Sequence, residues 1–189
     1  MSGVISVIEH PKSDESTARV RESDLKYLAR MFSEPTNERD FRNRALFLII
    51  DRTGLSAREV VALRFSDLTT DENGREVLKY TGKGGRPGFA NAEEEALRAV
   101  REYHEFAGIE SDYFFHSLPN RARGGTRTLL STRGLRLIVN NWNVRTSAGR
   151  PVNPRALRRT VLGRNRPENT ETQPDQDFPE ASPPVVRPA

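Results

Sequence analysis

Apolar residues recur at the three- and four-residue spacing of an amphipathic helix in six stretches of the chain. Polar residues suited to capping stand at the start of most of these stretches. Ser56, with Glu59 three residues later, forms a capping box. We expect helices over about residues 23–32, 38–52, 56–63, 91–107, 131–142 and 153–161, with Ser23, Ser56, Asn91 and Ser131 as caps.

Between the third and fourth of these stretches the period changes to that of strands. Residues 67–70 and 76–81 flank an Asn73-Gly74 hairpin signal, and a glycine-rich turn over residues 82–87 leads to a short third strand near Phe89. The pattern therefore predicts an α+β fold that is mainly helical, with a small antiparallel three-stranded sheet.

The chain has 189 residues, which is enough for one ordinary domain. From Pro167 onward, six of the twelve prolines fall together with five acidic residues, a composition that cannot form a packed core. We expect a disordered segment over residues 1–19, one domain over residues 20–166 and a disordered, acidic, proline-rich tail over residues 167–189.

The composition excludes several classes of chemistry. Cysteine is absent, which removes disulfides, thiolate metal sites and cysteine nucleophiles. No apolar run approaches the ~18 residues that a membrane span requires. We expect a cytoplasmic protein with no cofactor, no metal and no membrane partner.

The charge is divided unevenly along the chain. Residues 20–112 sum to −3 and residues 168–189 to −4, whereas residues 113–167 sum to +12 and contain neither lysine nor an acid. The twelve arginines of this basic segment are residues 121, 123, 127, 133, 136, 145, 150, 155, 158, 159, 164 and 166. Arginine suits bidentate recognition of phosphate, and nucleic acid is a polyanion whose phosphates repeat along a line. The segment predicts binding of nucleic acid, with a solvated basic face as the alternative.

Two sites could contact phosphates directly. Gly82-Lys83-Gly84 lacks the first glycine and the Ser or Thr of a phosphate-binding loop, so it is either a plain turn or a hairpin tip that carries Lys83 and Arg86 to a phosphate. Arg155, Arg158 and Arg159 share one face of the last predicted helix, whose N-terminus also favours anions.

Four motifs in order resemble the catalytic domain of tyrosine recombinases and phage integrases. They are Thr53-Gly54-Leu55 with Glu59, Leu63 and Asp67, the Lys83 hairpin, residues 131–142, and residues 153–160. The resemblance covers roughly residues 20–163. It implies phosphoryl transfer on DNA, in which a tyrosine attacks a phosphate, two arginines hold its oxygens, a hairpin lysine protonates the leaving oxygen and histidines assist. It matches Lys83 to that lysine and Arg158 to the second arginine.

Other positions depart from the family pattern. Ser56 stands where the first arginine is expected, and Arg155 and Arg159 replace the two histidines. Arginine stays protonated and cannot act as a base. Tyr27, Tyr80, Tyr103 and Tyr113 all precede Arg158, whereas the family nucleophile follows it. We interpret these four tyrosines as packing residues and Ser56 as a helix cap.

The sequence therefore predicts a protein that binds double-stranded DNA but does not cleave it alone. DNA-phosphate contacts are expected from Lys83, Arg86, Arg155, Arg158 and Arg159. Three alternatives remain: a helix-turn-helix regulator that uses residues 55–65, an active subunit that receives its tyrosine from a full-length recombinase partner, and a reading frame shifted near Gly163.

Overall fold

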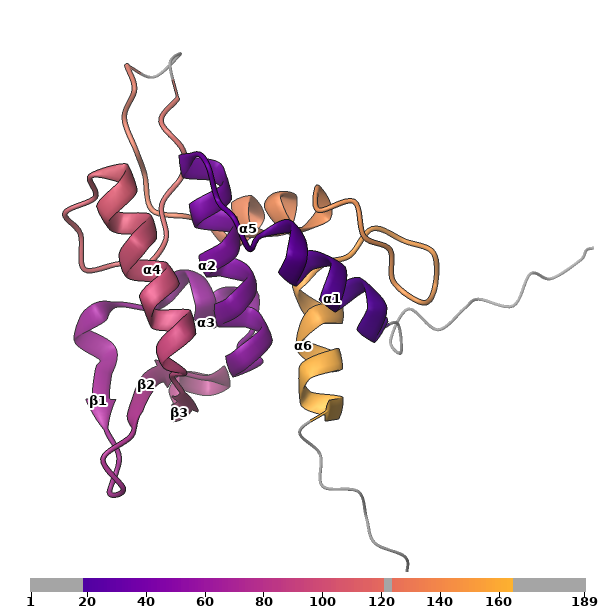
Figure 1. Cartoon of the computed structure of the whole chain (residues 1–189). Coiled ribbons are helices and arrows are strands. Elements are labelled where there is room, and N and C mark those ends of the chain that lie inside the picture. Colours follow the sequence, from indigo (N-terminus) through magenta and orange to yellow (C-terminus); the bar gives the residue numbers. More distant parts are fainter. Residues whose placement is uncertain (1–18, 121–123, 165–189) are drawn as a thin grey trace, which may run out of the picture.

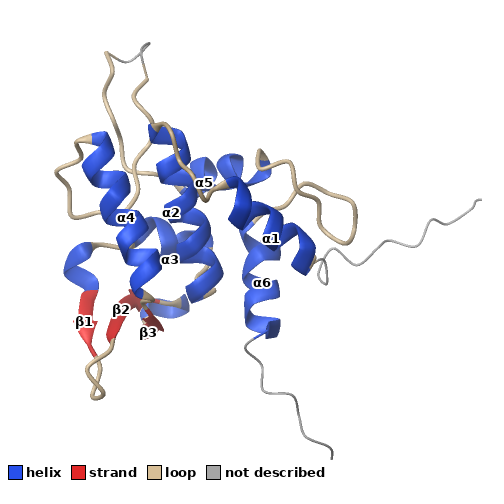
Figure 2. Ribbon diagram, in the orientation of Figure 1, coloured by secondary structure: helices blue, strands red, loops and turns tan. Residues whose placement is uncertain are grey.

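The computed structural model describes residues 19–120 and 124–164, which form a group of helices with a small sheet at one edge (Figure 1). The helices are α1 (Glu22–Met31), α2 (Glu38–Thr53), α3 (Ala57–Ala62), α4 (Glu94–Ala107), α5 (Thr132–Asn140) and α6 (Pro154–Arg164). The strands are β1 (Leu68–Thr70), β2 (Glu76–Thr81) and β3 (Pro87–Asn91). Figure 2 shows that much more of the chain lies in helices than in strands. The predicted α+β fold class is confirmed.

The three strands pair in chain order as an antiparallel sheet. Leu78 of β2 lies opposite Leu68 on β1 and Ala90 on β3. Leu78 and Ala90 are buried, whereas Phe89, one position along β3, is 64% exposed, as the two-residue period of a strand requires. One face of the sheet therefore covers the core and the other faces solvent.

Helix α2 lies at the centre of the molecule. All six residues from Ala45 to Ile50 are buried, so this helix has apolar neighbours on every side. It packs along α4 on one side and against α6 on another (Figure 1). The helix ends at Gly54, which takes the left-handed conformation (φ 62°) that favours glycine at this position.

Aromatic side chains join the outer helices to this centre. Trp142, two residues beyond the end of α5, packs edge-on against Phe32 after α1, with ring centroids 5.2 Å apart, and against Phe47 of α2, at 6.1 Å. Phe32 and Phe47 also contact each other at 5.8 Å. All three rings are buried, and together they fix α1 and α5 on α2.

The predicted helix starts are partly confirmed. Ser56 and Ser131 cap α3 and α5 through their side-chain oxygens. The expectations for Ser23 and Asn91 are wrong. Ser23 lies inside α1, which begins after Arg21 without a side-chain cap. Asn91 is the last residue of β3 and pairs with Val77, so the strand continues through a position that the sequence favoured as a cap.

The predictions for the tail over residues 167–189 and for nearly all of residues 1–19 lie outside the described residues, as do Arg121, Arg123 and Arg166. In the part of the chain that the structure describes, no helix is both long and apolar enough to cross a membrane.

Candidate nucleic-acid interface

A cleft of about 890 Å³ runs beside α6 and brings together residues from four parts of the chain. It is lined by Ser56, Ala57, Arg136, Asn140, Arg150, Pro151, Asn153, Pro154, Arg155, Arg158, Arg159 and Leu162. Five of these residues are arginines and none is acidic. We call this the arginine cleft.

Helix α6 supplies one wall of the arginine cleft because of its local sequence. Pro154 suits the first helical position, and the Asn153 side chain accepts a hydrogen bond from the Ala156 N–H (3.0 Å). Leu157 and Val161 are buried in the core. The opposite face, which begins with Arg155 and ends with Leu162, therefore lines the cleft.

The other walls come from α5, the loop after it and the start of α3. Ser131 accepts a hydrogen bond from the Gly134 N–H (3.0 Å) and so begins α5, whose Leu135 and Val139 are buried. Arg136 lies on the exposed side of this helix and lines the cleft with Asn140.

Glu59 connects α3 to α6 at the edge of the arginine cleft. Its Oε2 accepts a hydrogen bond from the Ser56 backbone N–H (2.6 Å) and lies 3.3 Å from Nη1 of Arg158. The Ser56 hydroxyl in turn accepts from the Glu59 N–H (3.4 Å), completing the capping box. The predicted capping role of Ser56 is confirmed, and the same carboxylate restrains the Arg158 guanidinium.

Lys83 and Arg86 lie elsewhere. The turn between β2 and β3 takes left-handed conformations at Gly84 (φ 74°) and Gly85 (φ 78°), which explains the glycines without invoking a ligand. Lys83 and Arg86 are exposed on this turn and do not line the arginine cleft. The structure therefore brings Ser56, Arg155, Arg158 and Arg159 together but leaves the hairpin cations apart from them.

Several arginines of the basic segment have structural roles that sequence reasoning missed. Arg127 pairs with Glu38 and donates to the Ala107 carbonyl (2.9 Å). Arg164 pairs with Asp51. Arg145 donates to the Gly149 carbonyl (2.7 Å). These partners lie on other elements or in a loop. Because these arginines already contact other parts of the protein, the net charge of the basic segment overestimates the number of arginines available to a polyanion. Conversely, Arg136 and Arg150 belong to the cleft, and only the arginine density indicated them.

The four tyrosines have different surroundings. Tyr103 is fully buried, and burial raises its pKa to about 12. Tyr113 packs under the guanidinium of Arg64, 4.3 Å from the ring centroid, and Tyr80 packs against the core and over Gly88. Tyr27 is 52% exposed on α1, so its assignment as a packing residue is wrong. Among the described residues, no tyrosine and no histidine lines the arginine cleft.

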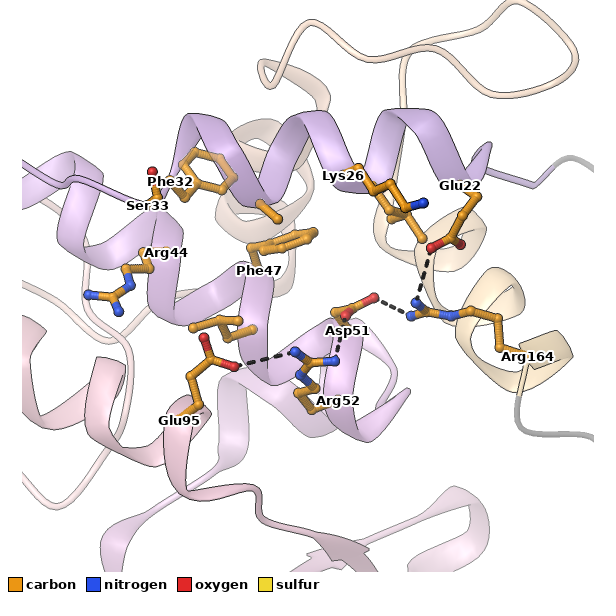
Figure 3. Close-up of a pocket in the computed structure, with 13 residues that line it drawn as sticks. Glu22, Lys26, Phe32, Ser33, Arg44, Phe47, Asp51, Arg52, Glu95 and Arg164 are labelled. Carbon is orange, nitrogen blue, oxygen red and sulfur yellow. Dashed lines mark hydrogen bonds and ion pairs between the residues drawn. The ribbon is translucent and has the colours of Figure 1, made fainter.

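A second cavity of about 310 Å³ lies between α1, α2 and α6, with Glu95 of α4 at its edge (Figure 3). Most charged side chains that line this cavity form ion pairs with one another. Arg164 contacts Asp51 and Glu22, and Arg52 contacts Asp51 and Glu95 (Figure 3). The positive charge here is therefore largely neutralised. Among the described residues, no group of three or more histidine or acidic side chains could hold a metal ion.

Comparison with known proteins gives sequence relatives of one kind, while no protein-family profile matches the chain. Tyrosine recombinase XerC of Xanthomonas axonopodis pv. citri (strain 306) is 28% identical over 154 residues, which is 81% of this chain and 47% of the relative. XerC of Chromobacterium violaceum is 28% identical over 127 residues, or 66% of this chain and 39% of the relative. The chain thus spans about half, or less, of the length of these curated relatives.

Solved structures share the fold. The XerH site-specific recombinase bound to palindromic difH substrate, in a post-cleavage complex, superposes with a TM-score of 0.53 at 20% identity, covering 76% of this chain and 40% of that one. The XerA recombinase gives the same TM-score, the same identity and the same coverage of this chain, and the superposition covers 48% of the XerA chain. The sequence relatives are tyrosine recombinases and the solved structures share the fold, so this chain is similar to tyrosine recombinases in both sequence and fold.

Proposed function

We propose that the chain binds double-stranded DNA through the arginine cleft, as a tyrosine recombinase type domain with a role in site-specific recombination. One observation carries the proposal: five arginines line a single cleft, and no acidic residue from the described part of the chain lines its wall. Guanidinium groups bind phosphate oxygens bidentately, and several along one cleft suit a backbone whose phosphates repeat. The family supports the choice of DNA, since XerH was solved with its difH substrate.

The hairpin cations extend this interface. Lys83 and Arg86 are exposed on a tight turn, and neither appears in an ion pair within the described residues. They are free to reach a second stretch of the DNA backbone. Phosphate contacts set the position of a protein on DNA but do not read its sequence, so we propose binding with weak sequence specificity.

The test compares matched double variants in duplex binding followed by fluorescence anisotropy. Arg136 and Arg155 are exposed in the cleft and take part in no ion pair within the described ranges. Their change to Gln is expected to weaken binding by about tenfold or more at low salt and to reduce the salt slope by about two. Unchanged affinity and slope would contradict the proposal.

A second double variant in the same DNA-binding measurement tests the helix-turn-helix alternative. It requires Arg58 and Arg64, but α3 has only six residues, and Arg64 donates to the Tyr113 hydroxyl while stacking on its ring. We expect Arg58→Gln with Arg64→Gln to bind DNA within about twofold of the unchanged chain because neither lines the cleft. Loss of binding in this variant alone would favour the alternative.

We further propose that the chain does not cleave DNA unaided. An attacking oxygen must lie close to the phosphorus and be activated by a base, yet the cleft contains no tyrosine or histidine. Ser56 is half-buried and bonded within the capping box, so it is not poised as a nucleophile. A full-length recombinase is the partner that would supply the missing groups.

This proposal predicts that no covalent adduct forms with a suicide duplex. The protein is incubated with DNA that carries a phosphorothiolate at the scissile position, denatured, and examined by gel electrophoresis and mass spectrometry. We expect the protein alone to remain free of DNA. When an active recombinase is added, we expect the DNA to become covalently attached to that recombinase and not to this chain. An adduct on any of the four tyrosines or on Ser56 would restore an active enzyme.

A further inference from the structure

The arginine cleft ends where the described chain ends. Its wall on α6 runs from Arg155 to Leu162, two residues before Arg164. Leu162 is 49% exposed at this end. Arg164 itself turns toward the opposite side of α6, where it pairs with Asp51 and Glu22 (Figure 3). The chain that follows α6 therefore begins beside the open end of the cleft.

The sequence after α6 is opposite in charge to the cleft. Residues 168–189 carry a net charge of −4, and their acids are Glu168, Glu171, Asp175, Asp177 and Glu180. Six prolines from Pro167 onward oppose helix and sheet formation.

The distances allow these acids to reach the arginines. Arg155 and Leu162 are seven residues apart on α6, which corresponds to roughly 10 Å along the helix axis. The four residue steps from Arg164 to Glu168 span up to about 14 Å when extended, and Glu171 reaches farther. The first two acids alone can therefore reach every arginine of the α6 wall.

We propose that the acidic segment over residues 168–180 occupies the arginine cleft and competes with DNA for it. This inference rests on the proposed DNA binding and assigns its regulation to the same site. In the second cavity Arg44, Arg52 and Arg164 pair with acids. In the arginine cleft, Arg136 and Arg155 take part in no ion pair within the described ranges, so the cleft is the more suitable place. Tethering gives the segment an effective concentration on the order of millimolar, so even a weak contact competes.

The first experiment measures the competition in the full chain. The five acids are replaced by Gln or Asn, and duplex binding is measured against salt. We expect roughly fivefold tighter binding at about 50 mM salt, with the difference vanishing near 0.5 M because the charges are then screened. A matched control removes five exposed acids outside the cleft (Glu34, Glu72, Glu94, Glu105 and Glu110). An equal gain in this control would mean that net charge alone acts, and would overturn the inference.

The second experiment does not use DNA, so it separates this inference from the proposed function. The chain has no cysteine, and Thr172→Cys therefore accepts a single spin label. We expect broadening of the backbone amide signals of residues 155–162 at low salt, and its loss in the variant without the five acids. Broadening without DNA binding would overturn only the proposed function. DNA binding without broadening would overturn only the occupied cleft.

A mixing control decides whether the contact is within one chain. Isotope-labelled protein without the spin label is combined with spin-labelled protein that carries no isotope. We expect no broadening in this mixture at low protein concentration. Broadening in this mixture comparable to that in the doubly labelled chain would identify a second copy as the source of the acidic segment and would overturn the intramolecular contact.

Discussion

His116 is a buried titratable residue that lies away from the arginine cleft. Its ring is 5.9 Å from that of His104, and its Nδ1 is buried without a hydrogen-bond partner among the described residues. Burial, and then the neighbouring His104 and Arg127, lower the pKa of His116. All three effects disfavour the protonated ring, so folding favours the neutral form.

This environment predicts a loss of stability in mild acid. The pKa of His116 is lower in the folded than in the unfolded chain, so its contribution is fully present above about pH 6.5 and is lost as pH falls through the lower, folded value. Urea unfolding between pH 8 and pH 5 should show a smaller pH slope in His116→Gln than in the unchanged chain. Equal slopes would contradict this assignment.

Individual side chains also show what sequence reasoning could and could not reach. The Ser56–Glu59 capping box was predictable because both partners lie within one turn. The pairing of Arg127 with Glu38 was not, because the two residues are 89 positions apart and meet only through the packing of the helices. The arginine cleft was thus predicted in its α6 wall and missed at Arg136 and Arg150.

At the level of elements, the attachment of α1 to α6 depends on a buried hydroxyl. Thr160 Oγ1 accepts a hydrogen bond from the Val20 N–H (2.9 Å) and donates to the Ala156 carbonyl (3.0 Å). Val20 lies two residues before the start of α1, and both Val20 and Thr160 are buried. One side chain therefore satisfies a backbone group of a segment 140 positions away.

Thr160→Val should destabilise the fold while preserving its shape. The substitution leaves the Val20 N–H buried without an acceptor, which costs about 1–3 kcal/mol. Thr160→Ser keeps the hydroxyl and is the matched control, with a smaller loss from one methyl group. Denaturant unfolding monitored by circular dichroism measures both. If Val and Ser lower the free energy of unfolding equally, the hydrogen bond is not the cause.

Local sequence patterns predicted the presence of helices and strands better than they predicted the first and last residues of these elements. The helical and strand periods placed all six described α-helices and the three described strands, because burial on one face imposes that spacing. The two errors, at Ser23 and Asn91, concern ends, where a capping residue competes with sheet pairing or with one more turn of helix. The turn after β2 was predicted as a glycine turn, and the left-handed Gly84 and Gly85 confirm it, whereas its contact with a phosphate through Lys83 and Arg86 stays a prediction.

At the scale of the whole molecule, the division of charge predicts how DNA binding responds to salt. The arginine cleft supplies five guanidinium groups, and the β2–β3 turn adds Lys83 and Arg86. If about six phosphates are neutralised, log K should fall with log salt at a slope near −5. Anisotropy titrations from about 50 to 300 mM salt measure this slope. A value shallower than about −2 would show that the arginines do not contact the backbone.

The cleft is held by contacts between distant parts of the chain, and this has a kinetic consequence. Glu59 and Arg158 are 99 positions apart, Asp51 and Arg164 are 113 apart, and Val20 and Thr160 are 140 apart. Pairings so far apart in sequence close large loops and tend to form late in folding. We therefore expect α6 to dock after α2 and α4 have associated. A chain caught before that step would have a core but no arginine cleft.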